Sequence, residues 1–89
     1  MPPTVTLYGI CDCEDTARTR AWLQQHHIEF CEVDLEQDIE AERFVIFINN
    51  GYRSTPTLVI GRGKCKVILT EPTDNDLETL LPLVGYLVT

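Results

Sequence analysis

The chain has 89 residues, 44% hydrophobic and 24% charged, which is enough for one packed domain and too few for two. Fourteen acidic residues face seven basic ones, and a net charge of −7 argues against a partner bound through a basic face, such as nucleic acid or an anionic membrane. No apolar run approaches the ~20 residues that cross a bilayer, and the first residues lack a secretory signal pattern. We expect one domain over residues 1–89, monomeric and cytoplasmic.

The first part of the chain shows a strand pattern followed by a helix pattern. The β-forming run Thr4–Tyr8 ends at Gly9 and predicts a strand. Good helix formers from residue 13 to residue 25 predict a helix, with Asp12 as its N-cap and Asp15 as the acid of its first turn. The residues expected to be buried on this helix are Ala17, Ala21 and Trp22. The predicted strand therefore leads through a short loop into the helix.

The middle of the chain repeats this order. Residues Ile28–Leu35 predict a second strand because apolar residues alternate with polar ones. We expect Cys31 on its inner face as a small buried hydrophobe. Residues Ile39–Ile48 predict a second helix, which ends before Gly51. Its apolar stripe has the spacing i, i+3, i+4, i+7 and consists of Ala41, Phe44, Val45 and Ile48.

The last part predicts a hairpin and a final helix. Residues Thr57–Ile60 and Cys65–Leu69 read as strands joined by the hairpin Gly61–Lys64. Thr73 with Asp76 is typical of a capped helix N-terminus. The apolar stripe expected on this last helix is Leu77, Leu80, Leu81 and Val84.

The element order is β-α-β-α-β-β-α, and a proline near the end of the last helix limits its length. Pro82 breaks or kinks that helix, so the tail is expected to form a separate turn. The strand-helix-strand unit makes the first two strands parallel, and the hairpin makes the last two antiparallel. These elements predict an α/β domain with a four-stranded mixed sheet and helices on both faces, the layout of a thioredoxin fold.

Two of the four cysteines are crowded at the predicted start of the first helix. Close thiols in a cytosolic protein indicate redox chemistry or a metal more than a structural disulfide. Cys13 lies where the first strand gives way to the helix, so unpaired backbone N–H groups and the helix dipole favour its thiolate. The thiolate is the species that attacks a disulfide, and Cys13 is therefore the candidate nucleophile, with Cys11 beside it.

Several segments together resemble glutaredoxins, in particular the glutaredoxin-like and mycoredoxin-like members of the thioredoxin superfamily. They are Cys13 with the helix behind it, Glu32–Leu35, Arg53–Ile60 and Leu69–Pro72. The likeness runs roughly from residue 5 to residue 81. It implies a thiol–disulfide oxidoreductase in which Pro56 is cis beside the reactive cysteine and the backbone of Thr55 pairs with a bound thiol peptide.

The resemblance also implies a co-substrate and a binding site. It implies glutathione as co-substrate or a disulfide-containing protein as partner, no bound cofactor and no metal. The residues that would hold the substrate are Arg53, Thr55, Pro56, Thr73 and Asp74.

The chain departs from the family pattern at the second cysteine. Thr16 stands three residues after Cys13, where these proteins usually have the resolving cysteine. Two routes remain open: a monothiol route, in which glutathione releases a mixed disulfide from Cys13, and a route in which Cys11 resolves it.

A second departure concerns charge and the glutathione contacts. Three acidic residues lie close to Cys13 in the sequence: Asp12, Glu14 and Asp15. Negative neighbours raise the pKa of a thiol, and Arg53 and Arg18 are placed to offset this increase. The double glycine that precedes the last helix in the family is replaced by Leu69–Pro72. A protein disulfide is therefore an alternative to glutathione as substrate.

Two rival hypotheses concern other thiol proteins. Residues 7–10, Cys13 and residues 20–23 also resemble arsenate-reductase-like and Spx-type proteins, which place the reactive thiol at Cys13 as well. A thioredoxin-fold binding module is the other rival, with Cys11 and Cys13 holding a soft metal. A four-ligand zinc site would need completion by Cys65, His26 or His27, residues distant in the sequence.

Overall fold

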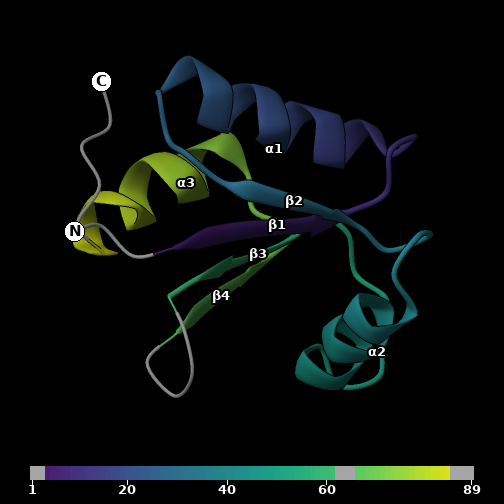
Figure 1. Ribbon diagram of the computed structural model, residues 1–89. Helices are drawn as coiled ribbons and strands as arrows, with labels where there is room; N and C mark the ends of the chain where they lie inside the picture. Colours follow the sequence, from purple (N-terminus) through teal and green to yellow (C-terminus); the bar gives the residue numbers. More distant parts are fainter. Residues whose placement is uncertain (1–3, 62–65, 85–89) are drawn as a thin grey trace.

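The computed structural model describes residues 4–61 and 66–84, which form one mixed sheet between two layers of helices. The strands are β1 Val5–Gly9, β2 Cys31–Asp34, β3 Thr57–Ile60 and β4 Val67–Thr70. The helices are α1 Glu14–Gln25, α2 Ile39–Ile48, α3 Asp74–Leu80 and the short 3-10 helix η1 Pro82–Val84. Helices α1 and α3 lie on one face of the sheet and α2 lies on the other (Figure 1). The predicted element order and layering are confirmed.

The strand register brings several loops to one end of the sheet. Strand order is β2-β1-β3-β4, with β1 parallel to β2 and antiparallel to β3, and β3 antiparallel to β4. Tyr8 pairs with both Val33 and Thr57, and Thr57 pairs with Thr70. The loops after β1 and β2, the loop before β3 and the segment after β4 therefore meet at the same end of the sheet.

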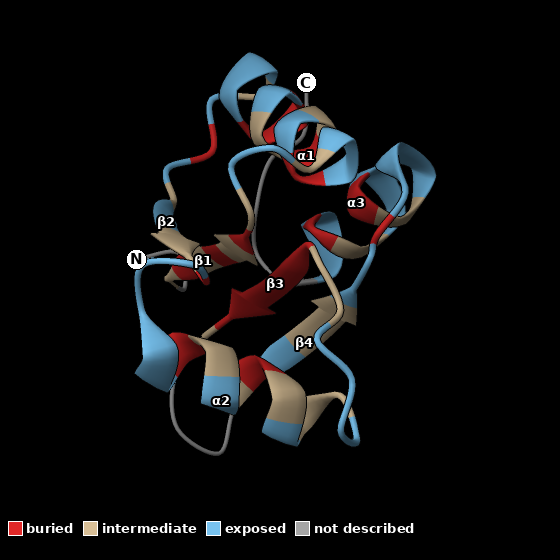
Figure 2. Ribbon diagram, turned by 90° about the vertical axis from the view of Figure 1, so that its right-hand side faces the viewer, coloured by how far each residue is buried: buried red, intermediate tan, exposed pale blue. Residues whose placement is uncertain are grey.

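The core consists of two clusters, one on each face of the sheet (Figure 2). The larger cluster joins α1 and α3 to the sheet and contains Val5, Leu7, Trp22, Leu23, Ile28, Leu58, Ile60, Leu77 and Leu81. The smaller one, under α2, contains Leu35, Ala41 and Val45. All four residues of β3 are buried, because this strand lies inside the sheet and helices cover both of its faces. Each fully buried leucine contributes roughly 1.5–3 kcal/mol to folding, so the larger cluster dominates stability.

The N-terminus of α1 differs from the prediction. Cys13 itself, with an extended backbone (φ −81°, ψ 123°), is the N-cap, and not Asp12. The buried face of the helix consists of Thr16, Thr19, Trp22 and Leu23, and the predicted buried residues Ala17 and Ala21 are exposed. The reactive-thiol candidate is therefore the residue that opens the helix.

The prediction of a buried Cys31 was also wrong, since this side chain is exposed. Cys31 begins β2, which is an edge strand, and α2 packs only against the far end of that strand, at Val33 and Leu35. A cysteine two residues before Val33 lies beyond the cover that α2 provides. Cys65 and most of the predicted hairpin lie outside the described residues.

The C-terminal elements follow the prediction closely. Thr73 and Asp76 form a reciprocal capping box at the start of α3. The helix stops at Leu80, and Pro82 begins a separate 3-10 turn, as expected for a residue that cannot continue an α-helix. Within residues 4–61 and 66–84, no helix combines the length and apolar composition needed to cross a membrane.

Candidate functional site

The thiol of Cys13 lies at the open end of α1. Its backbone N–H donates to the Ile10 carbonyl at 3.0 Å, which closes the loop after β1, and its carbonyl accepts from Ala17 N–H at 3.0 Å, the first hydrogen bond of the helix. The residue is half-buried. A helix N-terminus supplies unpaired N–H groups and a partial positive charge, so an anion at this position is stabilised. The fold places the sulfur where its thiolate form is favoured.

The groups around the sulfur lower the pKa of Cys13 below the ordinary cysteine value. The side chain of Cys13 does not close a regular capping hydrogen bond, yet the first turn of α1 surrounds it with donors. The Thr16 hydroxyl lowers the pKa most, and the Thr16 N–H, the Thr55 hydroxyl and the Asp15 N–H lower it further. Partial burial raises the pKa and opposes this effect. The net effect is that the pKa of Cys13 is lowered, despite the acidic residues nearby.

Thr16 fills the position of the absent second cysteine and is the site residue that sequence reasoning missed. Its side chain is fully buried, and its hydroxyl accepts a 3.5 Å hydrogen bond from Ile10 N–H. It packs tightly against Gly9 at the end of β1. The space is so small that a Cβ on Gly9 would lie only 2.4 Å from the Thr16 Cγ2. The signal was available in the sequence: with Cys13 as the N-cap, Thr16 is the third helical residue, whose N–H and side chain point back to the cap.

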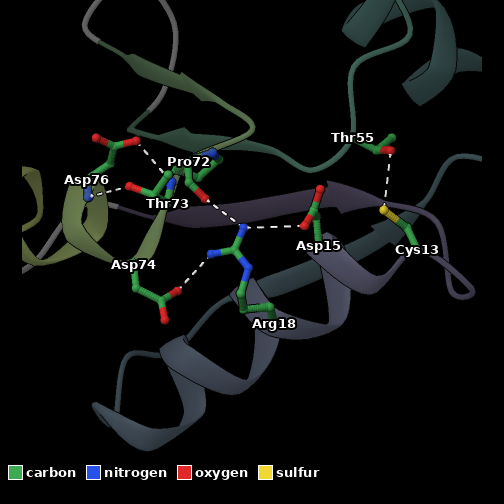
Figure 3. Close-up of polar contacts among 8 residues, drawn as sticks. All are labelled: Cys13, Asp15, Arg18, Thr55, Pro72, Thr73, Asp74 and Asp76. Atoms are coloured by element: carbon green, nitrogen blue, oxygen red, sulfur yellow. Dashed lines mark hydrogen bonds and ion pairs between the residues drawn. The ribbon is translucent and has the colours of Figure 1, made fainter.

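The loop before β3 meets the thiol from the opposite side (Figure 3). The peptide bond between Thr55 and Pro56 is cis, as the resemblance implied. The Thr55 hydroxyl donates to the Cys13 Sγ at 3.8 Å, although 42 residues separate the two in the chain. Cys13, Thr55 and Pro56 are therefore brought together as predicted.

Arg18 joins α1 to the start of α3 (Figure 3). Its guanidinium lies 2.9 Å from the Asp74 carboxylate and 3.6 Å from that of Asp15, and it donates to the Pro72 carbonyl at 3.3 Å. The predicted binding residue Thr73 exchanges two hydrogen bonds with Asp76 in the capping box. Thr73 and Asp74, both predicted to hold the substrate, thus already have partners within the chain.

Arg53 and Cys11 are the remaining residues of the predicted site. Arg53, two residues before Thr55, forms a 2.8 Å ion pair with Glu42 of α2. Cys11 is exposed in the turn between β1 and α1. Neither predicted base, Arg18 or Arg53, is available as an unpaired positive charge at the sulfur.

The described residues contain no group of three or more His, Cys, Asp or Glu side chains placed to hold a metal ion. His26, one of the distant candidates for a zinc site, ends α1 and stacks on Trp22 with ring centroids 4.0 Å apart. Cys65 lies outside the described part of the chain.

Comparison with known proteins agrees with this geometry. A family model described as Glutaredoxin matches residues 5–65. No curated protein sequence matches significantly. Among solved structures, the thioredoxin-like protein BC3987 has a TM-score of 0.72 at 24% identity, over 88% of this chain and all (100%) of that one.

Two further structures share the fold. A glutaredoxin from Archaeoglobus fulgidus has a TM-score of 0.67 at 20% identity, over 88% of this chain and 85% of its own. The glutaredoxin-like protein NrdH-redoxin from Escherichia coli has a TM-score of 0.62 at 17% identity, over 85% and 93% respectively. At these identities the structures establish the thioredoxin-like fold, and the family model covers more than half of the chain. This chain belongs to the glutaredoxin family.

Proposed function

We propose that the protein is a thiol–disulfide oxidoreductase in which Cys13 is the nucleophile. The observation that carries this proposal is the placement of a half-buried sulfur at the N-terminus of α1, where Thr16, Thr55 and backbone N–H groups lower its pKa. In the reaction, the Cys13 thiolate attacks one sulfur of a disulfide. A new bond forms from Sγ to that sulfur, the original S–S bond breaks, and the other sulfur leaves as a thiolate that takes up a proton.

Completing a turnover requires an external thiol as reductant, which ends oxidised in a disulfide. In the monothiol route, which we favour, a glutathione thiolate attacks the mixed disulfide and releases reduced Cys13. The alternative uses Cys11, whose thiolate attacks the Cys13 sulfur and expels the substrate, leaving a Cys11–Cys13 disulfide that an external thiol reduces. Thr16 supports the monothiol route, because a hydroxyl at that position stabilises a thiolate but cannot form a disulfide.

The substrates consistent with this chemistry are glutathione mixed disulfides and disulfides of other proteins. The family assignment supports both. We propose that the protein acts as a monomer in the reducing cytoplasm, where free thiols persist. The acidic composition supports neither nucleic acid nor an anionic membrane as a partner.

The proposal is tested by the turnover of a glutathione mixed disulfide with excess glutathione as reductant. Wild type, Cys13→Ser, Cys11→Ser and, as a control, Cys31→Ser are compared. The monothiol route predicts that only Cys13→Ser loses activity. The Cys11 route predicts that Cys11→Ser accumulates a covalent complex with a protein disulfide substrate, visible as a mass increase that dithiothreitol removes.

Two outcomes would contradict the proposal. Full activity in Cys13→Ser would show that another sulfur is the nucleophile. No turnover of either the glutathione mixed disulfide or a protein disulfide in any of the four proteins would favour a non-catalytic binding module instead.

A further inference from the structure

A groove lies between α2, the residues that follow β2, and Arg53 in the segment that leads to Thr55. It has a volume of about 310 Å³ and is lined by Leu35, Glu36, Ile39, Glu42 and Arg53. Ile39 is 63% exposed, a high value for a large apolar side chain, while Leu35 is buried. The groove therefore offers apolar surface beside the carboxylate of Glu36 and the ion pair of Glu42 with Arg53, with a net charge of about −1.

The groove and the reactive sulfur lie at the same end of the sheet. Leu35 N–H donates to the Gly9 carbonyl at 2.9 Å, which fixes the loop after β2 beside the end of β1. On the other side, Arg53 is two residues from Thr55, whose hydroxyl contacts Cys13. A polypeptide with a sulfur at Cys13 can therefore extend into the groove.

The charge of this end of the molecule is strongly negative. Eight of the fourteen acidic residues lie in two segments, residues 12–15 and residues 34–42, which flank the thiol and the groove. The nearby bases are engaged: Arg18 pairs with Asp74 and Asp15, and Arg53 pairs with Glu42. Arg43, on α2, does not line the groove. An anionic substrate such as a glutathione mixed disulfide is repelled here, and a cationic one is attracted.

We propose that this groove is the docking site for a polypeptide segment of an oxidised protein substrate in which basic and apolar residues flank the cysteine. This inference rests on the proposed function and specifies its substrate class. The apolar residue contacts Ile39, and the basic side chain lies against the carboxylate of Glu36, beside Glu42, which is paired with Arg53. The Cys13 thiolate then attacks the substrate disulfide, forms the mixed disulfide and releases the second substrate sulfur as a thiolate. An external thiolate then attacks the substrate sulfur of the mixed disulfide, forms a new S–S bond to it and releases Cys13 as a thiolate. A second external thiol displaces the first from the substrate, so that two thiols end as one disulfide.

The test uses three synthetic peptides of equal length, each with one cysteine activated as a mixed disulfide with 2-thiopyridine. The peptides share one leucine beside the cysteine and differ only in flanking lysines, glutamates or glutamines. Attack at the peptide sulfur releases thiopyridone, whose absorbance gives the second-order rate constant with reduced protein. The neutral peptide measures the intrinsic reactivity of the thiol, so each rate is divided by the neutral rate.

We expect the cationic peptide to react roughly tenfold faster than the anionic one at about 0.01 M ionic strength. The two rates should agree within about twofold at about 1 M, where charges are screened beyond ~3 Å. The double variant Glu36→Gln with Glu42→Gln removes both groove carboxylates and frees Arg53. For this variant, the cationic peptide should react only about twofold faster than the anionic one at low salt. Glu29→Gln, an exposed acid before β2 at the other end of the sheet, is the matched control and should retain the wild-type ratio.

The outcomes separate this inference from the proposed function. Equal rates for cationic and anionic peptides at low salt would overturn the inference and leave the redox function standing. The inference also fails, with the redox function intact, if the double variant keeps the wild-type ratio or if glutathione activated with the same 2-thiopyridyl group reacts faster than the cationic peptide. Failure of Cys13 to react with even the neutral peptide would overturn the proposed function and the inference together.

Discussion

Replacing Gly9 by alanine tests the contact that holds the N-terminus of α1 against the sheet. A Cβ on Gly9 would lie 2.4 Å from Cγ2 and 2.7 Å from Oγ1 of Thr16. Carbon atoms prefer a separation of about 3.5–4.0 Å, so the overlap exceeds 1 Å. Thr16 is fully buried and β-branched, and it has little freedom to move away. Overpacking of this kind costs typically 1–3 kcal/mol, and we expect about 3 kcal/mol here.

The assay is thermal unfolding followed by far-ultraviolet circular dichroism. A loss of about 3 kcal/mol lowers the Tm of a domain of this size by about 15 °C. Thr16→Ala deletes both overlapping atoms and leaves the Thr16 Cβ at 3.1 Å from the new methyl group. The double variant should therefore be about 2 kcal/mol more stable than the sum of the single losses predicts. Strict additivity, or a Gly9→Ala protein with the wild-type Tm, would refute this description of the packing.

Four further predictions concern the thiol, the core and a helix cap. Because the folded-state pKa of Cys13 is lowered, the folded protein binds fewer protons than the unfolded chain between that pKa and the ordinary value of 9.0. The stabilisation that the thiolate provides is thus fully present above pH 9.0 and is lost as the pH falls through the folded-state pKa. In urea unfolding, the difference in unfolding free energy between wild type and Cys13→Ser should therefore widen as the pH rises. The midpoint of the pH-rate profile for alkylation of Cys13 should rise in Thr16→Val and stay near wild type in Thr16→Ser, and an unchanged midpoint in the valine variant would contradict the role of the hydroxyl. Leu23→Ala, at a fully buried core position, should cost about 3 kcal/mol in urea unfolding, and a cost below ~1 kcal/mol would contradict the packing. Thr73→Ala should cost about 1 kcal/mol by removing the hydroxyl that caps Asp76 N–H, and no change would show that the capping box is inactive in solution.

Hydrophobic periodicity predicted α2 from Ile39 to Ile48 because the buried positions of that helix are apolar. The same reasoning failed on α1, whose buried positions include two threonines, Thr16 and Thr19. A threonine counts as polar in a periodic pattern, yet its methyl group packs like that of valine. Cys31 failed for another reason: whether an edge strand is covered depends on where the neighbouring helix ends, which periodicity within the strand does not reveal.

The site was predicted in part, from family resemblance and not from the periodicity that predicted the helices and strands. The cis bond between Thr55 and Pro56 and the proximity of this loop to Cys13 were implied by family resemblance, since no local pattern relates Cys13 to Thr55, 42 positions away. The ion pair between Arg18 and Asp74, 56 residues apart, depends on how α3 lies against α1. A count of charged residues revealed that the chain is acidic. It did not reveal that Arg18 pairs with Asp74 and Arg53 with Glu42, so that neither guanidinium is an unpaired positive charge for the thiol.

The first turn of α1 should make Cys13 the most reactive sulfur of the chain, and the proposed chemistry depends on this reactivity. Site-resolved alkylation measures it directly: the reduced protein is treated briefly with limiting iodoacetamide at pH 7, and each cysteine is quantified by peptide mass spectrometry. We expect Cys13 to be modified at least about tenfold faster than Cys11 or Cys31, although both of these are more exposed. Equal or faster modification of either exposed cysteine would contradict the assignment of Cys13 as the nucleophile.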